Sequence, residues 1–139
     1  MSAFSDLATE LFDSGLSCSE AVVTAAEEKL LGRAEGSEEL HRIASMFGGG
    51  MSSGCACGAV VGAQIVLGII FGKTKGEKGC LNSKIAAEFI TIFKSEHKVT
   101  CCAVLSRPYR KDHKAHHENC RKLVKECSKI LETLIEKYK

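Results

Sequence analysis

The sequence predicts an all-α protein, a compact bundle of about five to six helices around a buried apolar central helix. Apolar residues recur at helical spacing in nearly every segment, and no stretch alternates with a period of two for long enough to form a strand. One segment, residues 57–71, is apolar on all sides apart from Gln64, which predicts burial all round. With 139 residues, the chain is expected to form a single domain, residues 1–139.

Three helices are expected before the central one. Apolar residues at helical spacing predict the first over residues 4–12. Ser17 followed by Glu20 is a capping-box pattern, so the second helix should begin near Cys18 and run to about residue 31. A third helix is expected over residues 37–47, with its apolar residues on one face.

A glycine-rich loop should separate the third helix from the central one. Residues 48–54 contain four glycines, and stacked glycines lose too much chain entropy to form a helix interior. The central helix then covers residues 57–71. The remaining elements are expected in this order: a turn over residues 73–79, a helix over 82–98, a short turn or helix over 101–105, a break at Pro108, and a long helix over 112–138.

Composition and charge exclude several classes of protein. The net charge of +2 gives no strong field, so no nucleic-acid partner is expected. The N-terminus lacks a basic region followed by an apolar core, which argues against a secretory signal. The longest apolar stretch, residues 59–71, is shorter than the roughly 20 residues that cross a bilayer. We therefore expect a cytoplasmic protein without membrane insertion.

Eight cysteines are the main functional signal. Structural disulfides are rare in the cytoplasm, where cysteines are more often metal ligands or catalytic thiols. Thiolates bind soft metals and iron–sulfur clusters, exchange with disulfides, and attack electrophiles. The pattern of residues leaves these three chemistries open.

Cys57 opens the apolar helix, and Gly58 and Gly62 follow it four residues apart. The free N–H groups and partial positive charge of a helix N-terminus stabilise an anion. We therefore expect a lowered pKa for Cys57 and a thiol primed for metal ligation or redox chemistry. The two glycines should form a flat stripe where another backbone or a prosthetic group can come close. The alternative is tight helix packing with the cysteine as a small core residue.

The other cysteines give weaker signals. Cys55 is too close to the thiol that opens the central helix for an easy disulfide, although the two can serve as a ligand pair. Cys101 and Cys102 are adjacent, so only one of them can readily face a common site. Cys127 lies in the apolar stripe of the last helix and is expected in the core, whereas Cys80 in a turn is incidental or an interface thiol.

Two histidines near the start of the last helix suggest a metal site. His116 and His117 precede Cys120 by four and three residues, which puts the three side chains on one helical face. Lysines and a glutamate surround them, and such a composition is typical of a solvated helix start. We favour solvated imidazoles.

The order of the cysteines resembles a known family. Residues 57–62 read CGAVVG and match the CGAxxG motif for which a family of small, helical, redox-active proteins, C_GCAxxG_C_C, is known. The further cysteines of that family match Cys18 in CSEAV, Cys102 in CAVL and Cys120 in CRKLV. The resemblance covers nearly the whole chain.

The resemblance implies a redox-active protein that binds an iron–sulfur cluster through Cys18, Cys57, Cys102 and Cys120, for electron transfer or redox sensing. A similar domain occurs in the split-Soret cytochromes, where a cysteine cluster accompanies haem in a dimer. A homodimer is accordingly expected here. No Cys-x-x-Cys-His segment occurs in the sequence, so c-type haem is not expected.

Two alternatives remain open at this point. The chain could be a dithiol/disulfide oxidoreductase with Cys57 as the catalytic, attacking thiolate and Cys18 or Cys102 as the resolving thiol. It could also bind zinc or another soft metal, and Cys55, Cys101 and His117 are weaker candidates for additional ligands. Because all three functions need clustered thiols, the sequence does not separate them. It names neither a redox partner nor a substrate, and it leaves open whether the chain is an enzyme.

Overall fold

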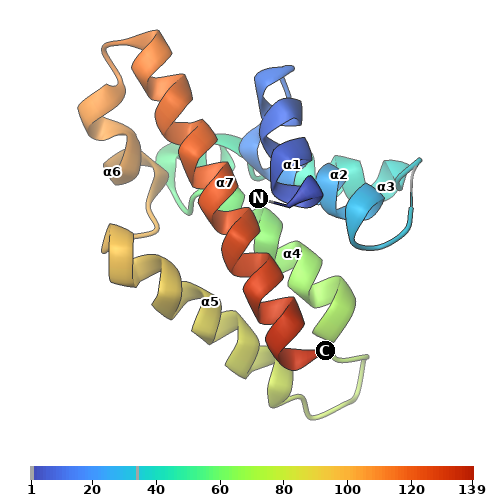
Figure 1. The fold of residues 1–139 in the computed structure, drawn as a ribbon. Helices are drawn as coiled ribbons and strands as arrows, with labels where there is room; N and C mark the ends of the chain where they lie inside the picture. The colour runs from blue at the N-terminus through green and yellow to red at the C-terminus, as the bar shows by residue number, and fades with distance from the viewer. Residues whose placement is uncertain (1, 34) are drawn as a thin grey trace.

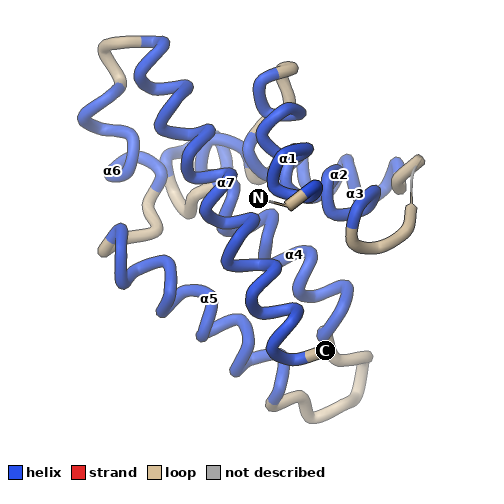
Figure 2. The backbone as a smooth tube through the Cα atoms, in the orientation of Figure 1, coloured by secondary structure: helices blue, strands red, loops and turns tan. Residues whose placement is uncertain are grey.

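Helix α4 lies at the centre of the fold, packed against α2, α5 and α7 (Figure 1). The computed structural model describes residues 2–33 and 35–139. Figure 2 shows the described chain as helices joined by loops, which confirms the predicted all-α class. In chain order the elements are α1 (Ala3–Asp13), α2 (Cys18–Lys29), α3 (Glu38–Ser45), the turn η1 (Gly50–Gly54), α4 (Gly58–Phe71), α5 (Leu81–His97), α6 (Cys102–Ser106), the 3-10 turn η2 (Arg107–Tyr109) and α7 (His113–Tyr138).

Polar side chains fix the starts of several helices. Ser37 and Asp112 accept hydrogen bonds from the first-turn N–H groups of α3 and α7. At Ser17 the predicted capping box is confirmed, because its hydroxyl accepts from the N–H of Glu20 and the Glu20 carboxylate accepts from the N–H of Ser17. These bonds satisfy N–H groups that have no partner inside the helix. They also fix Cys18 as the first residue of α2.

The apolar core lies where α1, α2, α4, α5 and α7 pack against one another. Phe89 and Phe93 of α5 are fully buried, as are Leu131 and Leu134 of α7. Val66 of α4 lies in the same cluster. Burying each of these side chains contributes about 1.5–3 kcal/mol, so the core is the main source of stability for the fold.

The prediction that α4 is buried on all sides is wrong for its second half. Helix α2 packs on the first turns of α4, where a Cβ at Gly62 would lie 3.0–3.3 Å from atoms of Ser19 and Val22. Beyond this crossing Gly68 is exposed, and Ile69 is 36% exposed. The close contacts of α2 with α4 occur at Gly58 and Gly62, whereas a Cβ at Gly68 would meet nothing within 4 Å. None of the described helices combines the length and the apolar character that a bilayer crossing requires.

Residues 48–54 form an irregular turn, in agreement with the predicted loop. Four consecutive residues, Gly49, Gly50, Met51 and Ser52, have positive φ angles between 56° and 65°. For the two residues with side chains this left-handed backbone costs about 1–2 kcal/mol each. At Gly50 the space also requires glycine, because a Cβ would lie 2.8 Å from the Cβ of Cys102. The turn is thus pressed against the beginning of α6.

Candidate cysteine centre

Four thiols from four separate segments face one small cavity between α2, α4, α6 and α7. This inner cavity has a volume of about 20 Å³, which is enough for roughly one water molecule. Its walls are almost entirely apolar apart from sulfur. The residues that line it are Cys18, Cys57, Cys102, Leu105, Ser106, Asn119, Cys120 and Leu123.

The glycine at position 58 brings the first two thiols together. A Cβ at Gly58 would lie 2.3 Å from Sγ of Cys18 and 2.9 Å from the carbonyl oxygen of Phe47. The Cys18 sulfur therefore occupies the space that a side chain would need. Because Gly58 directly follows Cys57, the glycines of the CGAxxG motif seat the first turn of α2 on the first turns of α4.

A short antiparallel bridge decides which thiol of each neighbouring pair faces the cavity. Ala56 and Cys101 form an isolated β-bridge. The N–H of Cys57 donates to the carbonyl oxygen of Thr100 at 2.7 Å. The N–H of Cys102 donates to the carbonyl oxygen of Cys55 at 2.5 Å. Cys57 and Cys102 line the inner cavity. Cys55 is exposed, and the Cys101 thiol donates to the Gly54 carbonyl oxygen at 3.0 Å.

The fourth thiol, Cys120, comes from the second turn of α7. That end of α7 is tied to α6, because the side-chain amide of Asn119 donates to the carbonyl oxygen of Leu105 at 3.2 Å. Leu105 and Leu123 form the apolar wall on either side. The side chains next to the thiols thus make the inner cavity narrow and mostly apolar.

The expected low pKa of Cys57 is wrong. Burial raises the pKa of Cys57 to about 12, and the neighbouring Cys18 thiol acts in the same direction. Backbone N–H groups at the start of α4 stabilise the thiolate, but the loss of hydration is the larger effect. Burial also raises the pKa of Cys120 to about 11 and raises the pKa of Cys102. Without a positive charge at the centre, these thiols stay protonated at neutral pH.

The spacing of the sulfur atoms is wider than a single metal ion requires. Within residues 2–33 and 35–139, no three cysteine sulfurs lie within 4.8 Å of one another. Four thiolates bound to one zinc ion at 2.3 Å would lie about 3.8 Å apart in tetrahedral geometry. In the described chain, three potential metal-ligand atoms lie within 4.8 Å of one another at a different place, in the side chains of Glu96, His97 and Glu126.

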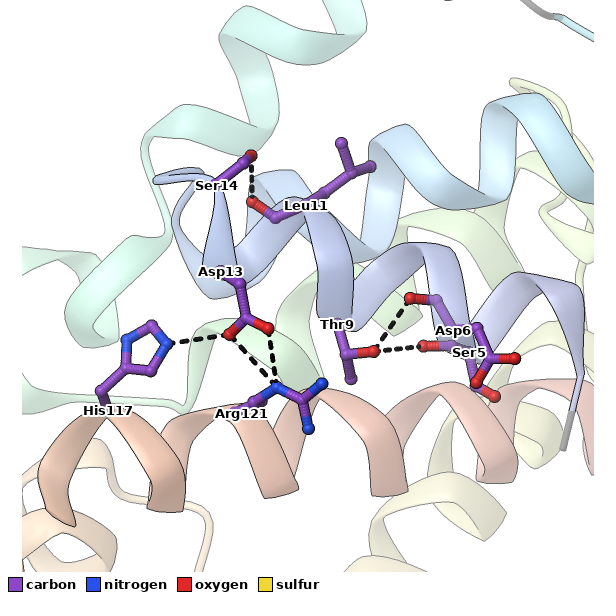
Figure 3. A network of polar contacts seen from close by, with 8 residues as sticks. All are labelled: Ser5, Asp6, Thr9, Leu11, Asp13, Ser14, His117 and Arg121. Atoms are coloured by element: carbon purple, nitrogen blue, oxygen red, sulfur yellow. Dashed lines mark hydrogen bonds and ion pairs between the residues drawn. The ribbon is translucent and has the colours of Figure 1, made fainter. Parts of the chain in front are cut away.

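The remaining sulfur and imidazole candidates lie outside the inner cavity. Cys127 is fully buried in the core, as predicted, and Cys80 is exposed at the start of α5. His117 contacts Asp13 at 2.9 Å and stacks on Phe12 with ring centroids 4.7 Å apart, so this imidazole packs against α1 (Figure 3).

A second, larger cavity opens outside the first. This outer cavity has a volume of about 540 Å³ and shares Cys18, Cys102, Ser106 and Cys120 with the inner cavity. Sequence reasoning missed its polar wall, because no motif connects the glycine-rich turn with the segment after Pro108. The remaining residues that line it are Phe12, Ser17, Gly49, Ser52, Gly54, Arg110 and His116.

An all-helical chain that gathers four thiols on one small, mostly apolar cavity is a cysteine-centred domain. The chain belongs to the C_GCAxxG_C_C family, described as "putative redox-active protein", whose model matches residues 16–134. The name of the family contains four cysteines, the number that faces the inner cavity. No curated protein and no solved structure matches the chain significantly.

Proposed function

We propose that this redox-active protein holds an iron–sulfur cluster on Cys18, Cys57, Cys102 and Cys120, and that it transfers electrons or senses redox state. One observation carries the proposal: four of the eight cysteines, each from a different segment, line one cavity, and the other four do not. Four thiolates are the usual ligand set of two-iron and four-iron clusters, which accept and donate single electrons.

The chemistry of the cavity supports a bound cationic centre. Burial and the neighbouring thiols raise the pKa values of Cys57, Cys102 and Cys120, so four free thiolates would repel one another in this cavity. Iron ions supply the positive charge that permits deprotonation. Leu105 and Leu123 add apolar walls beside the sulfurs, and Gly58 lets the Cys18 sulfur approach the start of α4.

Two observations weigh against the alternatives. The spacing of the sulfurs exceeds that of a preformed single-zinc site, whereas a two-iron or four-iron cluster spreads its ligands over a larger centre. To admit such a cluster, the four thiols would have to move apart, because the inner cavity measures only about 20 Å³. A dithiol oxidoreductase needs a thiolate as its attacking group, and burial raises the pKa of Cys57 to about 12. We therefore prefer the cluster to zinc and to disulfide exchange.

The test uses the neighbouring cysteines as matched controls. Protein purified without oxygen should contain iron and acid-labile sulfide and show visible absorption. Cys57→Ser and Cys102→Ser should each remove most of the iron, whereas Cys55→Ser and Cys101→Ser, one or two residues away, should keep it. Zinc without sulfide would favour the single-metal alternative, and equal iron loss in all four variants would contradict the proposed ligand set.

We also propose that the protein is a cytoplasmic homodimer. Apolar side chains exposed around the end of α4 and the start of α5 support this proposal, with Ile69 36% and Leu81 48% exposed. Exposed apolar residues next to each other often mark interfaces, and twofold pairing is the commonest closed assembly. Light scattering at micromolar concentration should give about twice the 15.0 kDa of one chain. A species of single-chain mass would contradict it.

A further inference from the structure

The outer cavity has the size and position of a ligand site. Its volume of about 540 Å³ falls in the range of small-molecule pockets, which is roughly 300–1,000 Å³. Cys18, Cys102 and Cys120 form its floor, and the same three residues belong to the inner cavity. A molecule bound there would therefore lie directly against the cysteine centre.

The charge of this cavity is positive. Arg110 lines it, and no carboxylate is among the residues that do. Within the described residues Arg110 forms no ion pair, whereas Arg121 and Lys122 of α7 each pair with a carboxylate. Its Nε donates to the hydroxyl of Ser106 at 3.2 Å, and that hydroxyl donates to the Cys102 carbonyl oxygen at 2.8 Å. The guanidinium is thereby held beside the cysteine floor with further donors free.

The nearest acidic residue on α1 is already engaged. Asp13 accepts from Nε of Arg121 at 2.9 Å and contacts His117, as Figure 3 shows. These contacts lower the pKa of Asp13, the hydrogen bond to His117 being the largest cause. The carboxylate therefore balances Arg121 and His117, and it does not line the cavity beside Arg110.

Neutral hydrogen-bonding groups complete the wall. The hydroxyl of Ser52 comes from the glycine-rich turn, and the imidazole of His116 comes from the first turn of α7. Ser17 also lines the cavity, but its hydroxyl is engaged with the N–H of Glu20 and the hydroxyl of Ser19. Phe12 adds one aromatic side. An arginine with neutral hydrogen-bonding groups beside an apolar floor is an arrangement that recognises a carboxylate or another oxyanion.

We propose that the outer cavity binds a small molecule with a carboxylate or oxyanion group, anchored by Arg110 and oriented by His116 and the Ser52 hydroxyl. The cysteine centre then meets its reaction partner as a small anion that enters this cavity, a role that rests on the proposed function. The anion contacts themselves come from Arg110, His116 and Ser52, none of which is a proposed ligand of the cluster.

The test measures the binding of two simple anions to the full-length protein. Sulfate and acetate serve as probes for oxyanions and carboxylates, and calorimetric titrations are run at constant ionic strength with glycerol as the neutral control. At least one of the two anions should bind. Arg110→Gln should weaken binding tenfold or more, and Arg110→Lys should weaken it less.

Arg107 provides the matched control. It is exposed, lies three residues before Arg110 and does not line the cavity, so Arg107→Gln removes the same charge without touching the site. The binding of either anion by this variant should equal that of the unmodified chain. Equal losses in both variants, no loss in Arg110→Gln, or no binding of either probe would overturn the proposal.

The metal content of each sample separates this inference from the proposed function. Arg110-dependent anion binding in protein that never holds iron would leave the anion site standing and remove the cluster. A normal iron and sulfide content with no anion binding would do the opposite. Thermal unfolding of each variant verifies that the substitutions leave the fold intact.

Discussion

The two ends of the bundle are built in different ways. At one end, where α5 and the C-terminal half of α7 pack on α4, regular helices bury large apolar side chains such as Phe89 and Leu131. At the other end, Cys57 and Cys102 are held by a left-handed turn, a single β-bridge and a five-residue helix, α6, while Cys18 and Cys120 come from α2 and α7. The first end derives its stability from buried apolar area, and the second positions thiols at some cost in backbone strain.

The stability of the apolar end allows the fold to tolerate a strained backbone at the cysteine end. Met51 and Ser52 adopt a left-handed backbone, yet they lie in the turn that packs against the start of α6. Strain of this kind persists only when the surrounding structure holds it in place. We infer that the apolar end keeps the fold assembled, while the backbone strain is confined to the cysteine end.

Removing a large side chain from the apolar end should give the largest effect. Phe89→Ala should lower the free energy of unfolding by about 3–5 kcal/mol, because it removes a fully buried ring and leaves a cavity. Leu81→Ala, on the same helix but 48% exposed, is the control and should cost far less. Denaturant titration measures both. Equal effects would mean that the apolar end does not carry the stability.

Alkaline pH should next destabilise the metal-free, reduced chain through the cysteine end. The folded pKa values of Cys57 and Cys120 are raised from 9.0 to about 12 and about 11. Folding keeps these thiols protonated, so their contribution is fully present below about pH 9 and is lost as the pH rises toward 11–12. The loss should be on the order of a few kcal/mol.

Unfolding curves between about pH 8 and pH 11 measure this dependence. Cys57→Ser removes the most strongly shifted of the cavity thiols and should flatten it. Cys80→Ser, which replaces an exposed thiol, should leave it unchanged. An identical slope in both variants would show that other groups, such as lysines or tyrosines, cause the alkaline loss.

The regular part of the fold was predictable because its signals are local. The capping box of Ser17 and Glu20 fixes the start of α2, and apolar periodicity places α5 and α7 to within a residue or two. Cysteine order and the family resemblance correctly singled out the four thiols that share a cavity. Their role as cluster ligands stays a prediction.

The rest depends on long-range packing. Which thiol of each pair turns inward follows from the Ala56–Cys101 bridge, between residues far apart in sequence. The pKa of Cys57 was predicted in the wrong direction because helix-end geometry is local, whereas the larger effect, burial, comes from the surrounding helices. The position of Arg110 beside the cysteines could not be predicted from the sequence, because it depends on the folding of separate segments around the outer cavity.

Gly58 and Gly68 of α4 differ in the space available for a side chain, which is filled at Gly58 and open at Gly68. Gly58→Ala should destabilise the protein by about 1–3 kcal/mol, since its Cβ would collide with Sγ of Cys18. Gly68→Ala in the same helix meets nothing within 4 Å and should stabilise it by about 0.5–1 kcal/mol. Denaturant titration gives both values. Destabilisation of similar size at both positions would show that the CGAxxG glycine has no special packing role.

Replacing Cys80 and Cys127, which do not line the inner cavity, should have the smallest effect. Cys80 is exposed, so Cys80→Ala should change the free energy of unfolding by no more than about 0.5 kcal/mol. Cys127→Ala removes one buried sulfur from the core and should cost on the order of 1 kcal/mol through the small cavity it leaves. Because neither side chain lines the inner cavity, the double variant should keep its full iron and sulfide content. Iron loss from a folded double variant would place Cys127 among the ligands. Its thiol lies near enough to Cys57 for that thiol to raise the pKa of Cys127.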